Sequence, residues 1–526
     1  MLEPFGPLSA STIWKRVAEA YAHAGPEIWS PVPAAVTGNA FVGDTFAAAL
    51  EAWLLDQRDA VDVREPLYVL ELGAGTGMFS HPFVTAIAHR RANGTFPHPR
   101  VVLVLCDQSE MRFDAWAETN VLAKHVRSGA IDFATLSVDE RGTFEPIVLK
   151  YTGASLAAPV NPLVVVANYF FDSIPTDAFR VRKGKLFEAR TRFVRVSDAP
   201  GFEGFQNEEQ IVEVGAARYG DALLDGVLAG YARDFAEASV LMPIAGIRVV
   251  NALQKLSVGR LLLLGLDKGI TTRGRVEGWF DQPFVAHSGV FSYLVNFDAM
   301  RRWFEAKGGF AICARARTIA RSSPSRAWFL GPAPPSRHLG RYFIDQIDSV
   351  DAFNAFTSFA HGIHELPKLT KAAGVGPLFD LLARMRGDPD AFAAIAHITD
   401  DVIAQADDGI RTLAVSLAEA AKQNFYSPRF HNDVFYWSGR LYYALDDYAA
   451  AERDFEASVA AFGKRSHARF FLGAIAEKRG FAETALGHYE RHRTVSPDSE
   501  VTRGAIRRMR EKLTRGGGKS PRASAS

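Results

Sequence analysis

The chain has 526 residues, and its 60 basic and 59 acidic side chains give a formal net charge of +1. Such a balance gives no indication of binding to nucleic acid or to an anionic membrane surface. A hydrophobic share of 48% and a charged share of 23% are typical of globular domains, and at about 100–200 residues per domain the length predicts two to four domains.

The cysteine count and the length of the apolar runs indicate where in the cell the protein is expected to be. The two cysteines, Cys106 and Cys313, form neither a disulfide framework nor a zinc-ligand pattern. The first residues lack a basic stretch followed by an apolar one, so no signal peptide is expected. Apolar runs such as Leu261–Leu264 are far shorter than the roughly 18 residues of a membrane helix. We therefore expect a cytoplasmic protein with no membrane association, no nucleic-acid partner and no bound metal.

Residues 1–60 are expected to form an N-terminal helical segment. Apolar residues recur at helical spacing in two stretches, which are separated by a loop rich in proline and glycine. The first stretch contains Ile13, Trp14, Val17 and Tyr21, and the second spans Phe46–Leu55.

Between residues 61 and 330, short apolar runs alternate with helical patterns. The runs are Leu67–Leu72, Val101–Cys106, Leu163–Ala167, Arg260–Gly265 and Phe310–Arg315. The helical stretches are Pro82–Arg91, Asp114–Val126, Gly220–Ala238 and Phe297–Ala306. Continuous apolar runs are typical of strands buried on both faces, and their alternation with helices predicts a doubly wound, mostly parallel α/β sheet of the Rossmann-like kind.

The remainder of the chain has a different character. A Gly- and Pro-rich stretch predicts a linker over residues 331–345, and an Ala-rich sequence without strand patterns predicts an all-helical domain over 346–513. The last stretch, residues 514–526, consists mainly of small and basic residues that cannot bury apolar surface, so it is expected to be disordered.

An internal repeat lies within the expected helical domain. Gly439, Ala451 and Phe455 recur 34 residues later as Gly473, Ala485 and Tyr489, the register of tetratricopeptide repeats, which we place at about 432–499. The small residues would let paired helices approach closely, with the aromatic residues between them. The alternative is an unrelated helical hairpin with coincidental spacing. Because a stable solenoid usually needs three or so repeats, helices from residues 346–430 are expected to pack against these two.

The most informative motif is Tyr68–Gly77, a buried strand carrying Glu71 followed by glycines 73, 75 and 77. Glycine permits positive φ and a close approach of the backbone to a ligand, and the next helix presents unpaired N–H groups. We assign this loop to cofactor binding, with the residues Glu71, Gly73, Ala74, Gly75 and Gly77.

The spacing of these glycines distinguishes two classes of cofactor. A dinucleotide fingerprint is G-x-G-x-x-G, whereas here the third glycine comes one residue early and a carboxylate precedes the first. S-adenosylmethionine (SAM) has no phosphate, and its ammonium and sulfonium are attracted to an acidic lip. The motif therefore favours SAM, the cofactor of class I methyltransferases. A nicotinamide or flavin nucleotide and a purely structural turn are the alternatives.

The second strand ends in Asp107, which is expected to accept the two ribose hydroxyls, with Gln108 beside it. Asp107 follows Gly75 by 32 residues, whereas the usual gap in dinucleotide-binding folds is nearer 20. A loop inserted at Arg90–Arg100 accounts for the extra length. The alternative is that Asp107 is an ordinary solvated acid at a strand end.

The third apolar run continues as Asn168–Pro175 (NYFFDSIP), which resembles the "ANEFFDALP" signature of the MidA-like methyltransferases. This family includes mitochondrial complex I assembly factors, and some members are implicated in protein arginine methylation. Asp107–Ser109 resembles the family's E-x-S, and Leu261–Gly269 resembles its "LLIDYG" strand. The resemblance covers about residues 10–320. Tyr169 replaces the family's glutamate, and the tetratricopeptide extension is absent from the family core.

Two residues after the third strand are candidates for catalysis. Ligands of open α/β sheets bind outside the carboxyl ends of the strands, where Asn168 can donate and accept hydrogen bonds near a methyl donor. Asp172 could orient an amine or guanidinium, or accept a proton during methyl transfer. The alternative is that Asp172 caps the following turn. Asp267 and His287 could reach the same cleft from the fifth strand.

These features together predict a SAM-dependent methyltransferase. We expect it to act on a protein side chain, with arginine implied by the resemblance, and we expect the repeats to recruit the substrate protein or a partner. The alternatives are a small-molecule methyltransferase and a non-catalytic assembly or scaffold protein that acts through its repeats.

Overall fold

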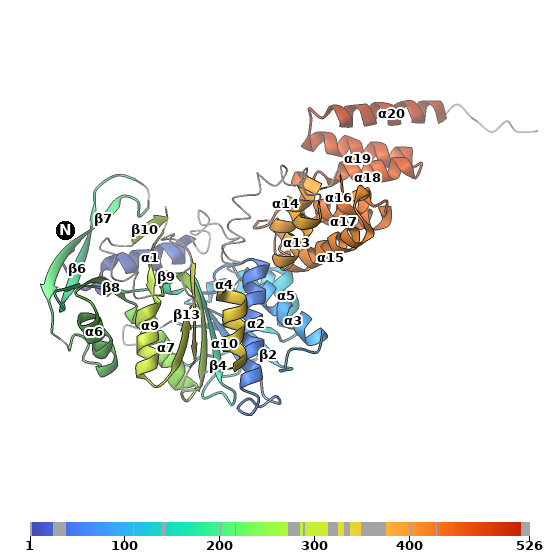
Figure 1. The fold of residues 1–526 in the computed structure, drawn as a ribbon. Helices are drawn as coiled ribbons and strands as arrows, with labels where there is room; N and C mark the ends of the chain where they lie inside the picture. Colours follow the sequence, from blue (N-terminus) through green and yellow to red (C-terminus); the bar gives the residue numbers. More distant parts are fainter. Residues whose placement is uncertain are drawn as a thin grey trace, which may run out of the picture. The chain divides into compact units, whose positions relative to one another are not determined.

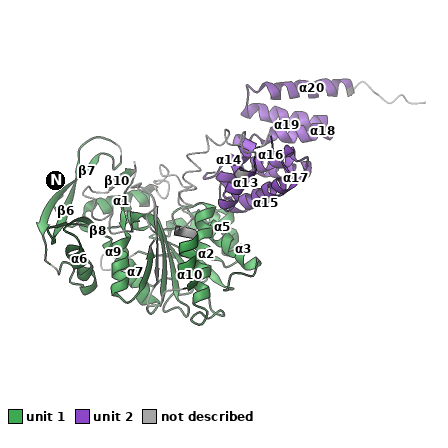
Figure 2. Cartoon of the chain, in the orientation of Figure 1, with its two compact units in different colours: residues 1–354 green, residues 355–526 purple. Residues whose placement is uncertain are grey.

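The computed structural model describes residues 3–24, 38–108, 110–137, 144–199, 201–215, 217–271, 284–287, 290–313, 324–330, 337–348, 375–399, 402–427 and 429–516. The chain divides into two compact units, residues 1–354 and residues 355–526 (Figure 2).

Unit 1 is built on a mostly parallel sheet with the strand order β13-β14-β9-β4-β1-β2-β3. The parallel strands are β1 (Leu67–Leu72), β2 (Val101–Asp107), β3 (Ile131–Thr135), β4 (Leu163–Asn168) and β9 (Leu261–Ile270). β14 (Pro324–Leu330) runs antiparallel between β9 and β13 (Phe310–Cys313), and β12 (Val295–Asn296) pairs with the end of β9. The parallel α/β sheet predicted from the sequence is confirmed.

Helices cover both faces of this sheet because successive side chains of a buried strand point to opposite faces. In Figure 1, α7 and α9 lie on one side of the sheet, and α2, α3 and α10 lie on the other. Leu70, Val165 and Leu263 belong to a core cluster that includes residues of α6, α7 and α9. The helix bounds are α2 Ala40–Asp56, α3 Ser80–Ala92, α6 Ala222–Asp234, α7 Ile244–Leu256, α9 Phe297–Ala306 and α10 Arg337–Tyr342.

The order of the parallel strands determines where a ligand can bind. In chain order they lie 3-2-1-4-5, so the direction of winding reverses between β1 and β4. In open α/β sheets the crevice at such a switch point, outside the carboxyl ends of the strands, is the usual ligand site. The glycine loop follows β1 directly and therefore lies at this position.

A second, antiparallel sheet in unit 1 has the order β7-β6-β5-β8. Its strands are β5 (Asp177–Arg182), β6 (Lys185–Arg195), β7 (Phe205–Glu213) and β8 (Glu237–Met242). The sequence did not predict this sheet, and the helix expected over 220–238 is wrong at its carboxyl end. α6 ends at Asp234 because Phe235 adopts an extended conformation, and β8 begins at Glu237.

Helix α1 (Thr12–Ala24) packs on this second sheet. Ile13, Trp14 and Val17 share a core cluster with residues of β5, β6 and β8 and with β11 (Val290–Tyr293), which forms a hairpin with β10 (Phe284–His287). The Trp14 ring lies 4.9 Å from the Phe291 ring, centroid to centroid. The short helix η1 (Leu8–Ala10) precedes α1 and accepts the Trp14 indole N–H at the Leu8 carbonyl, 2.8 Å away.

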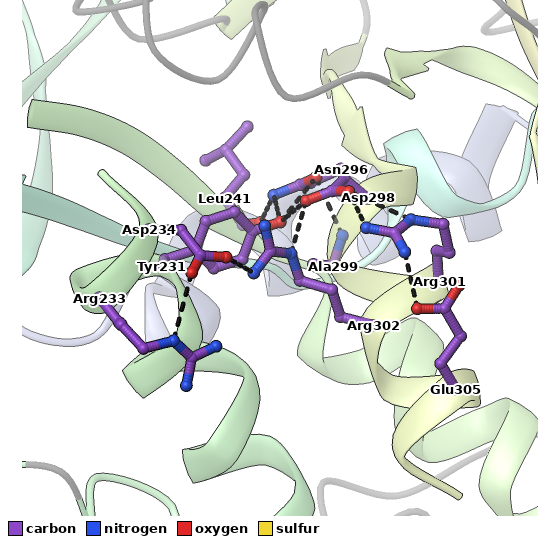
Figure 3. Close-up of polar contacts among 10 residues, drawn as sticks. All are labelled: Tyr231, Arg233, Asp234, Leu241, Asn296, Asp298, Ala299, Arg301, Arg302 and Glu305. Carbon is purple, nitrogen blue, oxygen red and sulfur yellow. Dashed lines mark hydrogen bonds and ion pairs between the residues drawn. The ribbon is translucent and has the colours of Figure 1, made fainter. Parts of the chain in front are cut away.

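A buried polar network joins α6, β8 and α9 (Figure 3). The Tyr231 hydroxyl donates to Asp298 Oδ2 at 2.7 Å. Arg302 donates to the same carboxylate at 2.8 Å and to Asp234 at 2.7 Å. The Asn296 amide donates to the Leu241 carbonyl at 3.0 Å, so the network connects the two sheets of unit 1.

Residues 337–348 are helical, whereas the sequence predicted a linker over 331–345. They form α10 and a π-helical segment, η5 (Phe343–Asp348), while residues 331–336 lie outside the described part of the chain. The main-chain N–H groups of His338 and Leu339 donate to the Asp56 carboxylate at 2.9 Å, and Leu339 is buried. The Gly- and Pro-rich stretch therefore precedes a helix that packs on α2 of unit 1.

Within the described part of residues 355–526 every regular element is a helix, which confirms the all-helical expectation. The main helices are α13 Gly376–Arg384, α14 Pro389–Thr399, α15 Asp408–Asn424, α16 Val434–Ala444, α17 Tyr448–Phe462, α18 Ala468–Lys478, α19 Ala482–Val495 and α20 Glu500–Gly516. The short helices η7 (Ile403–Gln405) and η8 (Gly463–Arg465) connect some of them. α20 extends three residues into the tail expected to be disordered from 514, and residues 517–526 lie outside the described part.

The helix pairs α16–α17 and α18–α19 each contain the same kind of contact, between a glycine and an aromatic ring. A Cβ atom added at Gly439 would lie 2.6 Å from the Phe455 ring, and one added at Gly473 would lie 2.7 Å from the Tyr489 ring. Both the glycines and the aromatic residues are 34 positions apart in the sequence. Glycine is therefore required at both positions by the same close approach of two helices.

We expect Gly473→Ala to destabilise unit 2 by about 1–3 kcal/mol, because the added methyl group would overpack the contact with Tyr489. Gly487→Ala is the matched control, since Gly487 also lies within a helix but its Cβ would meet nothing within 4 Å. That variant should gain up to about 1 kcal/mol from helix propensity. Urea denaturation monitored by helical circular dichroism measures both, and equal effects of the two substitutions would contradict the proposed contact.

Candidate functional site

The glycine loop after β1 adopts a conformation that other residues rarely take. Gly73, Gly75 and Gly77 have φ values of 62°, 55° and 75°, in the left-handed region. The Ala74 N–H donates to the Cys106 carbonyl at 3.1 Å, which ties the loop to β2. The Trp116 indole N–H donates to the Gly75 carbonyl at 3.1 Å from α4 (Met111–Glu118).

The glycines of this loop differ in how closely the described residues surround them. Among those residues, a Cβ added at Gly75 would meet nothing nearer than the Gly73 carbonyl oxygen, at 3.8 Å. A Cβ added at Gly73 would lie 3.1 Å from the Phe170 ring, so the segment after β4 lies beside the loop. Helix α3 begins at Ser80, three residues after Gly77, and its first N–H groups lie close to the loop in sequence. Among the described residues, Gly75 is therefore the position in the loop that is least enclosed by neighbouring atoms.

Glu71 lies behind the loop rather than at its lip. Its side chain is buried, and Oε2 accepts a hydrogen bond from the Ser80 hydroxyl at 2.6 Å. Burial raises the pKa of Glu71 to about 8, although the hydrogen bond from Ser80 acts in the opposite direction. At neutral pH the carboxyl group is therefore mostly protonated, in contrast to the charged acidic lip expected from the sequence.

This protonation makes the stability of unit 1 depend on pH. A carboxyl whose pKa is higher in the folded than in the unfolded state favours folding at low pH, and that advantage is lost as the pH rises from about 4.5 to 8. Glutamine at position 71 can keep the Ser80 hydrogen bond without an ionisable group. We expect Glu71→Gln to be the more stable protein at pH 8.5 by about 2–4 kcal/mol and to approach wild type at pH 5. Urea denaturation at both pH values tests this, and a pH-independent difference would contradict it.

Asp107 ends β2 and is 5% exposed. Its Oδ1 accepts the main-chain N–H of Gln108 at 2.7 Å, and its Oδ2 accepts the hydroxyl of Tyr21 at 3.2 Å. The Gln108 side chain is exposed. The acid is therefore at the strand end where the sequence placed it, but a tyrosine from α1 contacts it.

The carboxyl end of β4 carries an unusual backbone conformation. Asn168 is the last residue of the strand and is half-buried, and Tyr169 has a φ of 53°. The Tyr169 N–H donates to the Leu266 carbonyl of β9 at 2.7 Å. A non-glycine residue in the left-handed region costs energy, and such residues cluster at functional sites. This is the position at which the chain departs from the MidA-like signature.

Asp172 lies in the short helix η4 (Phe171–Ser173) after β4, next to a second buried acid. Its main-chain N–H donates to Asp267 Oδ2 at 3.1 Å, and Asp267 Oδ1 accepts the Lys268 N–H at 2.8 Å. Burial raises the pKa of Asp172 to about 6 and the pKa of Asp267 well above its usual range, the latter with a contribution from the charge of Asp172. The pair therefore retains a proton near neutral pH.

The structure brings most of the predicted residues to one edge of the sheet. The loop residues, Asp107 and Asn168 lie at the carboxyl ends of the neighbouring strands β1, β2 and β4. Asp172 lies one turn farther along, with Asp267 of β9. The side chain of His287 lies outside the described part. Sequence reasoning missed the contact between Tyr21 and Asp107, because these residues are far apart in the chain. It also missed the pairing of Asp267 with Asp172, although Asp267 stands out as an acid within a run of apolar residues.

Among the described residues, both metal-binding clusters and membrane-spanning helices are absent. No group of three or more His, Cys, Asp or Glu side chains there is placed to hold a metal ion. In the same part of the chain, none of the helices has the length and hydropathy needed to cross a bilayer.

Comparison with known proteins found no matching family model and no matching curated protein. Two solved structures from Burkholderia thailandensis are similar over 64% of this chain and 97% of theirs. One is an uncharacterized COG1565 superfamily protein, with 14% identity and a TM-score of 0.36. The other is a COG1565 superfamily member bound to S-adenosyl-homocysteine, with 15% identity and a TM-score of 0.35. Similarity at this level assigns neither fold nor function, so the site is interpreted from its own geometry.

Proposed function

We propose that this protein is a SAM-dependent methyltransferase whose cofactor site is the glycine loop of unit 1. The observation that carries the proposal is the place of Gly75 at the switch point between β1 and β4, where an added Cβ would have no described neighbour nearer than 3.8 Å, with Asp107 at the end of the adjacent strand. A ligand whose nucleoside lies between them would place its ribose at Asp107 and its remaining polar groups over the loop.

Several features favour SAM over a dinucleotide. The glycines have the spacing G-x-G-x-G rather than G-x-G-x-x-G. The buried carboxyl group of Glu71 lies behind the loop, and an acidic group there offers no favourable interaction to an anionic pyrophosphate. The cationic SAM would instead favour ionisation of Glu71. The antiparallel strand β14 between β9 and β13 departs from the dinucleotide-binding sheet, which has the order 3-2-1-4-5-6.

Bound SAM would supply an electrophilic methyl group on a sulfonium. The protein's own residues would mainly position the reactants, which is the largest contribution that an in-line displacement needs. Asn168 and Tyr169 at the end of β4 flank the loop on the side away from Asp107. Asp172, whose main-chain N–H donates to Asp267 Oδ2 at 3.1 Å, would hold an amine or guanidinium and accept the proton that the methylated nitrogen releases.

For the acceptor we propose a protein side chain, with arginine favoured only by the MidA-like resemblance. The helical unit, as tetratricopeptide repeats, would recruit the substrate protein or a partner. Support comes from the repeated glycine–aromatic contact and from cationic side chains placed over aromatic rings. The Arg440 guanidinium lies 5.3 Å from the centroids of both Trp437 and Phe471, and such groups recur at peptide-binding surfaces.

Calorimetric titration of the full chain with SAM and with NAD tests the cofactor assignment. We expect SAM to bind with a micromolar Kd and NAD not to bind. Binding of NAD alone would establish the dinucleotide alternative, and binding of neither would refute the cofactor site. Transfer of labelled methyl groups into a cell extract, with and without prior protease digestion, then distinguishes a protein acceptor from a small molecule.

A further inference from the structure

Tyr21 contacts the carboxylate that the proposed function assigns to the ribose. Its hydroxyl donates to Asp107 Oδ2 at 3.2 Å, although the two residues are 86 positions apart. Burial and the charge of Asp107 raise the pKa of Tyr21, so the tyrosine keeps its proton and is the donor. The Arg112 guanidinium of α4 lies 5.5 Å from the centroid of the Tyr21 ring. The tyrosine is thus held between the ends of two elements that border the site.

Helix α1 carries Tyr21 to Asp107, while its other half packs on a different sheet. Its first half is anchored on the antiparallel sheet and the β10–β11 hairpin through Ile13, Trp14 and Val17. Tyr21 lies in the second half of the same helix and contacts the end of β2 in the parallel sheet. The helix therefore spans from the second sheet to the ribose end of the site.

The carboxylate beneath Tyr21 is nearly inaccessible. Asp107 is 5% exposed, whereas Gly73 of the glycine loop and the next residue in the chain, Gln108, are exposed. Two ribose hydroxyls cannot reach Asp107 unless a group that covers it moves. The Tyr21 hydroxyl donates to Oδ2 in the way a ribose hydroxyl would donate, and it comes from an element outside the sheet.

We propose that Tyr21 is a gate for the nucleoside, whose hydroxyl occupies the position of one ribose hydroxyl and is exchanged for it when the ligand binds. The inference rests on the proposed function, because it takes Asp107 as the ribose acceptor. The hydrogen bond to Asp107 stabilises the ligand-free state and is absent from the bound state. A substitution that removes this hydrogen bond therefore destabilises the ligand-free state and shifts the binding equilibrium toward the complex.

The test is calorimetric titration of wild-type protein and Tyr21→Phe with SAM and with S-adenosyl-homocysteine. Phenylalanine keeps the ring and its contact with Arg112 but cannot donate to Asp107. Hydrogen bonds to charged groups are among the stronger ones, so we expect the variant to bind both ligands roughly tenfold more tightly.

Tyr219→Phe is the matched control. The Tyr219 hydroxyl donates to Asp177 Oδ2 at 2.9 Å, a tyrosine–aspartate bond between the segment before α6 and the start of β5. This variant should bind both ligands as wild type does. Unchanged or weaker binding by Tyr21→Phe would overturn the gate, since a tyrosine that remains on Asp107 in the complex is a positioning residue. If wild-type protein binds neither ligand, the cofactor assignment fails, and the gate fails with it.

Discussion

Gly75→Asp is expected to abolish binding of SAM, with a loss in affinity on the order of 100-fold or more. The φ of 55° already disfavours any residue with a side chain. The new carboxylate would extend over the loop into the position proposed for the ligand, where an added Cβ has no described neighbour nearer than 3.8 Å. Because SAM is cationic, the added negative charge alone would attract it, so a loss of binding reports the occupied volume. Calorimetric titration of the folded variant measures the effect.

Gly94→Asp separates the backbone effect from the effect on the ligand. Gly94 has a φ of 70°, and an added Cβ there would also have no described neighbour within 4 Å, but Gly94 lies in the loop after α3. The two variants should lose similar stability in thermal unfolding, while Gly94→Asp keeps wild-type affinity for SAM. Retention of SAM binding by Gly75→Asp would show that the ligand does not lie over this glycine.

Asp298→Ala is expected to destabilise unit 1 by about 2–4 kcal/mol. The substitution removes the acceptor of the buried Tyr231 hydroxyl and of two arginine side chains, Arg301 at 2.6 Å and Arg302 at 2.8 Å (Figure 3). Arg302 is only 16% exposed, so its lost bond is poorly replaced by water. Urea denaturation of the full chain, followed at the unit 1 transition, gives the change in the free energy of unfolding.

The control for this variant lies on the same helix. Glu305 pairs with Arg301 at 2.6 Å, but its side chain is 47% exposed. Glu305→Ala should cost no more than about 0.5 kcal/mol, because exposed ion pairs contribute little. Equal losses in the two variants would mean that the network in Figure 3 owes its strength to surface charge rather than to burial.

The sequence predicted three strands that are buried on both faces, but it missed β3, which is also buried and whose short run is interrupted by Asp132. β1, β2 and β4 are continuous apolar runs, and their expected bounds differ from the structure by at most one residue. The antiparallel sheet was missed because it alternates charged and apolar residues, with Arg192 of β6 paired to Glu208 of β7 across its exposed face. The helix expected over Asp114–Val126 is split at Thr119, which adopts an extended conformation between α4 and α5.

The candidate site was predictable only where its residues are adjacent in the chain. The glycine loop and Asp107 follow their strands directly, so the pattern of apolar runs locates them. Tyr21 and Asp107 are 86 residues apart, and Asp172 and Asp267 are 95 residues apart. Periodicity in a single sequence carries no information on which distant segments meet. The raised pKa values of the buried acids follow mainly from their burial in the folded chain, which the sequence pattern does not give.

The place of β14 in the sheet has a consequence for synthesis on the ribosome. Residues 324–330 pair with β9 on one side and with β13 on the other, although β13 precedes them in the chain. Until they leave the exit tunnel, the apolar edge of β9 and the strand β13 have no β14 to pair with. A nascent chain paused before residue 324 would therefore expose an open sheet edge, the kind of surface that chaperones recognise and that aggregates.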